Sequence, residues 1–196
     1  DEKKELKLTP EQQEDLKSVF RVRKDDREIF NVVVEALDEN DAPVIITQSE
    51  FMRRMKDMSQ IGGGMNFYGE LPDSYNLVVN PNHPLVAAIS GEMSAAGGEE
   101  MEALGKEMKR LGEETAFLEK DHSSRKSEEI SQAEKDDLDK LKKEYDEVKS
   151  KRSQILEKFG FENQKVRQLI DLALLANNML KGEELSNFVN RSVSLL

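Results

Sequence analysis

Apolar residues recur at steps of three and four positions between residues 101 and 155, in two separate runs. Charged residues of both signs fill most other positions, which is typical of coiled-coil helices. The polar stretch DHSSRKSEE, at 121–129, separates the runs. The pattern predicts a long charged antiparallel coiled-coil hairpin that projects as an insertion at 99–159. Two helices packed into the globular core are the alternative. The expected seam consists of Met101, Leu104, Met108, Leu111, Thr115 and Leu118, then Leu138, Leu141, Tyr145, Val148, Arg152 and Ile155.

The last part of the chain has a different pattern. Residues 166–180, VRQLIDLALLANNML, are apolar over far more than one helical face, and a helix of this kind must be buried nearly all round. A second apolar stripe follows, so residues 160–196 are predicted to form a helix pair that joins a second copy in an intermolecular four-helix bundle with twofold symmetry. A bundle within one chain is the alternative. The predicted dimer interface consists of Leu169, Leu172, Ala173, Ala176, Leu180, Leu185, Phe188, Val189 and Val193.

Helix and strand signals alternate through residues 9–98. Thr9, Pro10 and Gln12 form a helix start with a possible capping box. Three runs rich in β-branched or aromatic residues then predict strands. The fold class is therefore predicted to be α+β, with a small three-stranded sheet and helices, and residues 1–8 are expected to be a linker edge. The predicted strands occupy residues 29–37, 44–47 and 75–79.

A methionine-rich segment lies between the second and third predicted strands. Ser49 can cap a short helix over residues 49–60, and a triple glycine follows. On this helix Phe51, Met55 and Met58 share one narrow face, with Met52 at its flank. Such a stripe commonly packs into a core. It can also bind other proteins, because unbranched methionine side chains adapt to many partners.

Composition excludes several classes of function. The net charge is −11 and the sequence contains no cysteine. An acidic chain is poorly suited to nucleic acid or to a membrane surface, so neither is an expected partner. No apolar run is long enough to span a bilayer. The absence of cysteine and of a signal sequence favours a cytoplasmic location for the protein. The start of the chain resembles an internal segment of a longer protein.

No catalytic or metal-binding motif is recognisable. The glycines at 62–64 follow a predicted helix and lack the lysine and hydroxyl partners of a phosphate loop. His83 and His122 have no neighbours at metal-ligand spacing. We therefore expect no catalytic residue, no metal and no bound cofactor, and this segment is not predicted to be an enzyme.

Several segments, in order along the chain, are familiar. PVIITQSEFMRRM, a glycine-rich loop, LVVNPNHPLV, QLIDLALLANNML and SNFVNR occur in succession. This series resembles the C-terminal domain of the ninety-kilodalton heat-shock chaperone family, in its bacterial high-temperature protein G branch. The resemblance covers residues 9–95 and 160–196. The hairpin at 99–159 departs from the usual pattern, in which the connection is much shorter.

The resemblance implies a role in protein folding and the stress response. In that family the last two helices hold a homodimer together, in agreement with the interface predicted above. An amphipathic helix contacts unfolded or partly folded client proteins, and Phe51, Met52, Met55 and Met58 match it by position; Ser59 occupies a place that is apolar in some relatives. ATP and Mg²⁺ would bind only in the N-terminal domain of the full-length protein, which would be an ATPase.

A structural adaptor is the alternative function. In that interpretation the coiled-coil hairpin binds one specific partner protein, and the α/β part serves as its scaffold.

Overall fold

The computed structural model describes residues 7–24, 27–28, 30–48, 54 and 75–194. The chain divides into two compact units. The sheet unit comprises Asp1–Glu92 and Glu157–Leu196, and the hairpin unit comprises Met93–Leu156. Each unit is described by itself.

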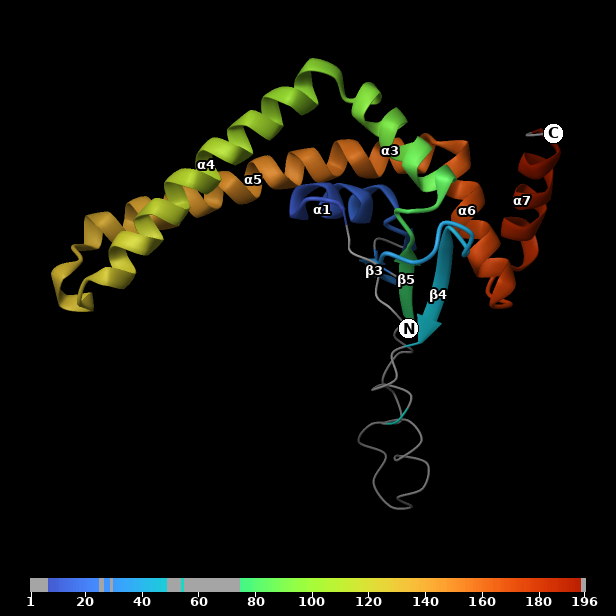
Figure 1. Cartoon of the computed structure of the whole chain (residues 1–196), viewed down its shortest axis with the longest axis horizontal. Helices are drawn as coiled ribbons and strands as arrows, with labels where there is room; N and C mark the ends of the chain where they lie inside the picture. The colour runs from blue at the N-terminus through green and yellow to red at the C-terminus, as the bar shows by residue number, and fades with distance from the viewer. Residues whose placement is uncertain (1–6, 25–26, 29, 49–53, 55–74, 195–196) are drawn as a thin grey trace. The chain divides into compact units, whose positions relative to one another are not determined.

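A three-stranded mixed sheet lies at the centre of the sheet unit (Figure 1). Its strands are β3 (Phe30–Val34), β4 (Val44–Gln48) and β5 (Tyr75–Val79), in the order β3-β5-β4. β5 pairs parallel with β3 and antiparallel with β4. The α+β class and the three predicted strands are confirmed. Two shorter strands, β1 (Arg23–Lys24) and β2 (Arg27–Glu28), pair antiparallel and were not predicted.

The first strand ends earlier than the sequence pattern predicts. The prediction runs to residue 37, but β3 ends at Val34 because its neighbour β5 ends at Val79. Glu35 N–H makes one more bond, to the Val79 carbonyl at 3.1 Å. Leu37 N–H then donates to the side chain of Asn80 instead, at 3.2 Å. The chain therefore leaves the sheet where no strand remains to pair with it.

Asn80 organises the connections at this edge of the sheet. Its side chain is fully buried, and its Oδ1 also accepts from Asn82 N–H at 3.1 Å. Its Nδ2 donates to the Asp38 carbonyl at 2.7 Å, and its own N–H donates to Pro43 O at 2.9 Å. One buried amide thus ties the turn after β3 to the turn after β5, which explains why a polar residue occupies a core position.

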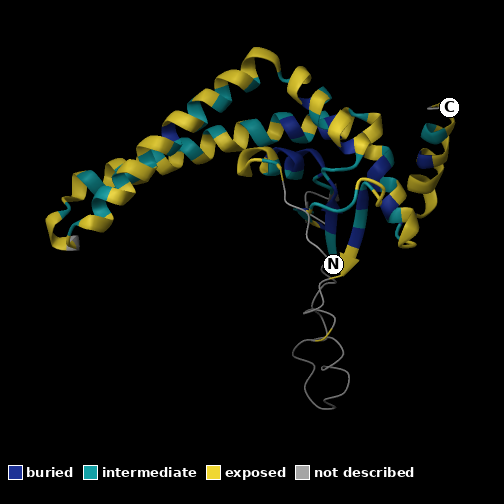
Figure 2. Ribbon diagram, in the orientation of Figure 1, coloured by how far each residue is buried: buried dark blue, intermediate teal, exposed yellow. Residues whose placement is uncertain are grey.

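Helices cover this sheet. α1 (Pro10–Val19) begins with the predicted capping box between Thr9 and Gln12, and it contacts β3. α6 (Gln164–Ala176) contacts both β4 and α7 (Gly182–Ser194). α3 (Pro84–Ala96) begins after β5, and His83 Nδ1 accepts from Leu85 N–H at 3.1 Å in its first turn. Figure 2 shows the buried residues gathered on the strands and on the inward sides of these helices. The most deeply buried apolar side chains of the unit are Leu16, Val19, Phe20, Leu77, Val79, Val86, Ile89 and Val166.

α5 (Gln132–Glu162) ends in the sheet unit, close against the end of α1. A Cβ atom added to Gly160 would fall well inside van der Waals contact of the Val19 carbonyl oxygen. Beside this contact, Arg21 forms an ion pair with Glu157 at 2.6 Å. Only glycine permits this approach of the two backbones.

The hairpin unit contains α4 (Gly98–Ser124), the short 3₁₀ helix η1 (Ser127–Glu129) and α5 up to Leu156. α4 and α5 are antiparallel, because Glu119 pairs with Lys142 at 2.8 Å while Arg152 donates to the Met101 carbonyl at 3.4 Å. All twelve predicted seam positions are buried or half-buried in the burial pattern along α4 and α5. Leu111 is the most buried of them. Leu156 is equally buried, although the predicted seam contains its neighbour Ile155 instead.

Polar contacts close the tip of the hairpin. Arg125 binds Asp121 at 2.9 Å and Glu134 at 2.8 Å, and it donates to the Glu129 carbonyl at 2.6 Å. The Glu134 carboxylate also accepts from the N–H and the hydroxyl of Ser131, at 2.7 and 2.8 Å. Ser131 thus caps the start of α5 as in a capping box. Arg125 first, and then Ser131, lower the pKa of Glu134 to about 2.

Gly160→Ala should destabilise the sheet unit. The new methyl group forces α1 and α5 apart, and overpacking of this kind costs about 2 kcal/mol. Gly91→Ala is the matched control, because a Cβ there meets nothing within 4 Å. Inside α3 that change should raise stability by up to about 1 kcal/mol. Denaturant unfolding of both variants measures the difference, and equal stabilities would contradict the close approach.

The tip of the hairpin should loosen in acid. The folded pKa of Glu134 lies below its ordinary value of 4.5, so its contribution to stability is present above about pH 4.5 and is lost as pH falls toward 2. We expect Arg125→Gln to raise the pKa of Glu134 toward 4.5 in an NMR titration of the carboxyl carbon.

Arg110→Gln is the control for this titration. Arg110 pairs with Glu107 and Glu114 on α4 instead, at 2.6 and 2.8 Å. The Arg110→Gln change should therefore leave the pKa of Glu134 unchanged. An equal effect of both variants would mean that general charge, and not the contact with Arg125, sets that pKa.

Candidate interaction surface

α6 and α7 form an antiparallel pair at the end of the chain. Asn163 caps α6, because its side-chain oxygen accepts from the N–H groups of Lys165 and Val166 at 2.9 and 3.1 Å. Two residues at the reversal into α7 have positive φ: Asn178 in the connection, at 56°, and Gly182, the first residue of α7, at 59°. Asparagine and glycine tolerate this left-handed backbone, so the chain can reverse within a few residues.

The inner sides of both helices belong to the core of the sheet unit. Val166, Leu169 and Ala173 of α6 are at most 4 % exposed, and Phe188 of α7 is 9 % exposed. Leu180, in the connection, is also buried. These residues are spaced at three and four positions along α6, as expected for one buried helical face.

A second face of the pair is apolar and exposed. Leu172 is 46 % exposed, Val189 49 % and Val193 67 %. Large apolar side chains spaced in this way, three or four residues apart, place an apolar stripe on the exposed surface of each helix of the pair. We call this surface the exposed apolar face. It consists of Leu172, Leu175, Ala176, Leu185, Val189 and Val193.

Two polar contacts hold α7 against α6. Gln168 Nε2 donates to the hydroxyl of Ser192 at 2.7 Å, and Arg191 forms an ion pair with Asp171. Burial raises the pKa of the Asp171 carboxyl, against the opposing effect of Arg191 and Arg167. A partly buried ion pair of this kind fixes the relative position of two helices more than it adds stability.

The structure places the nine predicted interface residues on two different faces. Leu169, Ala173, Leu180 and Phe188 are buried within the chain. Leu172, Ala176, Leu185, Val189 and Val193 lie on the exposed apolar face. Leu175, which is 39 % exposed, also lies there and is absent from the predicted interface. Its signal was present in the sequence, because it is adjacent to Leu172 and Ala176 on a helical wheel.

The predicted client-binding residues cannot be placed in the same way. Phe51, Met52, Met55 and Met58 lie outside the described residues. Arg54, the one described residue of that segment, is helical and exposed. The amphipathic helix therefore stays a prediction.

The described ranges contain neither a membrane-spanning helix nor a metal cluster. None of the helices there is both long and apolar enough to cross a membrane. No group of three or more His, Cys, Asp or Glu side chains in those ranges could hold a metal ion. The Nδ1 atom of His83 already accepts the Leu85 N–H at the start of α3.

Comparison with known proteins gives one consistent answer. Chaperone protein HtpG of Bacteroides thetaiotaomicron is 46 % identical over 198 residues. HtpG of Bacteroides fragilis is 43 % identical over 198 residues, and that of Porphyromonas gingivalis is 39 % identical over 199. Each alignment covers this whole chain and 29 % of the relative. No protein-family profile and no solved structure matches the chain.

Over its whole length the chain is therefore homologous to a segment of bacterial HtpG chaperones. The resemblance to the C-terminal domain of the ninety-kilodalton heat-shock chaperones, in the high-temperature protein G branch, is confirmed. The chain spans about 29 % of the length of these relatives.

Proposed function

We propose that this chain is the dimerization and client-contacting domain of an ATP-dependent chaperone. The observation that carries the proposal is the exposed apolar face of α6 and α7. Five large apolar side chains on it, including Leu172 and Val189, are 36 % exposed or more. A patch of this kind on a small unit usually marks a protein interface.

A second copy of the chain is the proposed occupant of this face. Two antiparallel helices with one uncovered apolar side can be completed by the same pair in twofold symmetry, which yields a four-helix bundle. Homology to HtpG chaperones supports this proposal, since the sequence resemblance implies a homodimer. Leu169, Ala173, Leu180 and Phe188 would then support the interface from beneath, and the residues of the exposed apolar face would make the contacts.

Client binding is assigned to the methionine-rich segment. Phe51, Met55 and Met58, with Met52 beside them, would offer an adaptable apolar stripe. Dimerization would bring two such stripes together, so that two weak contacts act as one stronger contact. The hairpin unit is proposed to be a coiled coil that serves the same chaperone.

The remaining proposals follow from the family resemblance and from the acidic composition. ATP and Mg²⁺ would bind in other domains of the full-length protein, and this chain would carry no enzymatic activity. The protein would work in the bacterial cytoplasm, without nucleic-acid or membrane partners.

Leu172→Glu should dissociate the dimer. Each interface would then bury two carboxylates without partners, which costs several kcal/mol and should raise the dissociation constant about a hundredfold or more. Light scattering over a dilution series measures the molar mass. A wild-type chain that is monomeric at every concentration would refute the proposed interface.

Gln164→Glu is the matched control for this change. It places a carboxylate on the same helix, at an exposed position outside the exposed apolar face. The dimer should persist in this variant. Circular dichroism should show unchanged helix content in both variants, because residue 172 is already 46 % exposed.

Replacing Phe51, Met55 and Met58 together by Ser should weaken client binding about a hundredfold or more without lowering the molar mass. Each change removes an apolar contact worth about 1 kcal/mol or more when buried. Suppression of aggregation of a denatured model protein measures the effect. The control replaces Lys56 and Asp57 by Ser on the other side of the predicted helix. Cooperative unfolding of the triple variant would show that the stripe belongs to the core.

A further inference from the structure

The sheet unit contains a pocket that the proposed dimerization and client contacts do not use. It has a volume of about 430 Å³ and lies between the ends of α1 and α5, the strand β3 and the helices α6 and α7. Pockets for small ligands usually measure about 300–1,000 Å³. On α7 its wall is formed by Glu184, Asn187 and Arg191, a different stripe from Leu185, Val189 and Val193 of the exposed apolar face.

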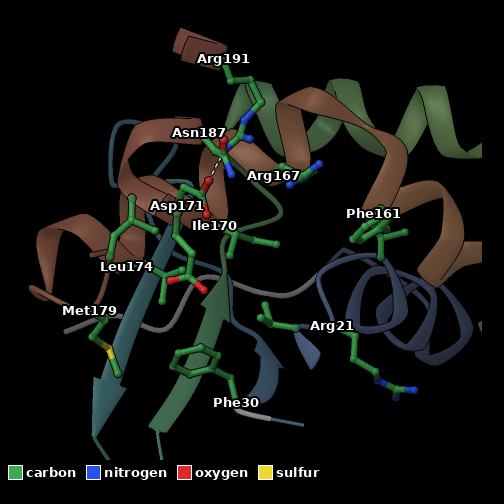
Figure 3. A pocket seen from close by; sticks show the side chains of 15 residues that line it. Arg21, Phe30, Phe161, Arg167, Ile170, Asp171, Leu174, Met179, Asn187 and Arg191 are labelled. Carbon is green, nitrogen blue, oxygen red and sulfur yellow. Dashed lines mark hydrogen bonds and ion pairs between the residues drawn. The ribbon is translucent and has the colours of Figure 1, made fainter. Parts of the chain in front are cut away.

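The pocket is amphipathic. Figure 3 shows Arg191 and Asp171 gathered at one end, with Arg167 beside them, and Phe30 and Met179 toward the other end. Val19, Val22, Ile170 and Leu174 add further apolar wall. A ligand that fills this space therefore needs an apolar body and one polar head.

One buried hydrogen-bond donor at the polar end has no acceptor. The Nε atom of Arg191 is buried and has no hydrogen-bond partner in the described part of the chain, although the same guanidinium binds Asp171 through Nη2. A buried donor without an acceptor is costly and marks a place where an acceptor can bind.

Arg167 supplies the second cation. It forms no ion pair with another described residue, and its guanidinium lies over the ring of Phe161, 5.2 Å from the centroid. The other arginine of the wall, Arg21, is already paired with Glu157. Against these donors the wall offers the carboxylates of Asp171, held by Arg191, and Glu184.

We propose that this pocket binds a small amphipathic carboxylate, with its hydrocarbon chain along Phe30 and Leu174 and its head on Arg167 and Arg191. A carboxylate supplies the acceptors that the guanidinium groups lack, and charge-assisted bonds to arginine are among the strongest available. The hydrocarbon chain would leave water for a wall that is mostly apolar. All residues of the site belong to the sheet unit of one chain, so the site does not require the dimer.

Octanoate and n-octylammonium are the probes, because they share one chain and differ in the sign of the head. Backbone NMR of the whole chain should show saturable shifts for octanoate, centred on residues 167–174 and 184–191. Octylammonium should bind at least tenfold more weakly. Stronger binding of the amine would overturn the proposal, because Asp171 or Glu184 would then be the recognition group.

Two variants test where the probe binds. Arg167→Gln removes an exposed cation with little effect on folding and should weaken octanoate binding about tenfold. Leu174→Asp should abolish binding by placing a charge in the apolar wall. Leu172→Glu, on the exposed apolar face, should leave binding unchanged even as a monomer, so failure of this site and failure of the dimer are distinguishable. Octanoate shifts centred on Leu172 and Val189, or unchanged affinity in Arg167→Gln, would refute the pocket as the binding site.

Discussion

The pairing of β5 with both of its neighbours is the constraint on which the sheet unit depends. β3 and β4 follow one another in the chain but do not pair, and among the described strands each pairs with β5 alone. β5 begins more than 25 residues after the end of β4, so the pairing of these two strands requires a long connection. Leu77, Val78 and Val79 are at most 3 % exposed, as expected for a central strand covered on both faces. The buried Asn80 then fixes the turns at the end of this strand.

This small sheet also explains why the last helices keep an uncovered side. Three strands of five residues offer little area, and α1 and α6 already contact the two edge strands β3 and β4. α7 packs on α6. The exposed apolar residues of α7 therefore have no further layer to contact within the described chain. A small unit that cannot bury all its apolar surface commonly does so against another copy. The proposed dimer and the uncovered face are thus consequences of the same geometric limit.

The pocket arises from the way in which α7 is held. Arg191 reaches Asp171 across the helix pair while Gln168 binds Ser192, so two separate contacts set the position of α7. Beneath them the end of α5 approaches α1 through Gly160. The space that remains between these elements is lined by apolar residues and by arginine, which gives it the character of a ligand site.

Local features were predictable because neighbouring residues alone cause them. The capping box at Thr9 and Gln12, the three strands and the half-buried seam of α4 and α5 all follow from spacing within a few residues. The early end of β3 was not predictable, because it depends on where β5 stops, 45 residues further along. The homology to HtpG chaperones was also evident from the sequence, since the motifs that carry it occur in a fixed order.

The candidate surface was predictable only in part. The sequence by itself determined that α6 and α7 are more apolar than one buried face requires. Only the tertiary structure decided that Leu169 and Phe188 are covered by their own chain while Leu172 and Val189 are not. The pairing of Arg191 with Asp171 and of Arg21 with Glu157, 136 residues apart, was likewise decided by packing. Helical periodicity reports which residues share a face, but which neighbour covers that face depends on contacts between distant parts of the chain.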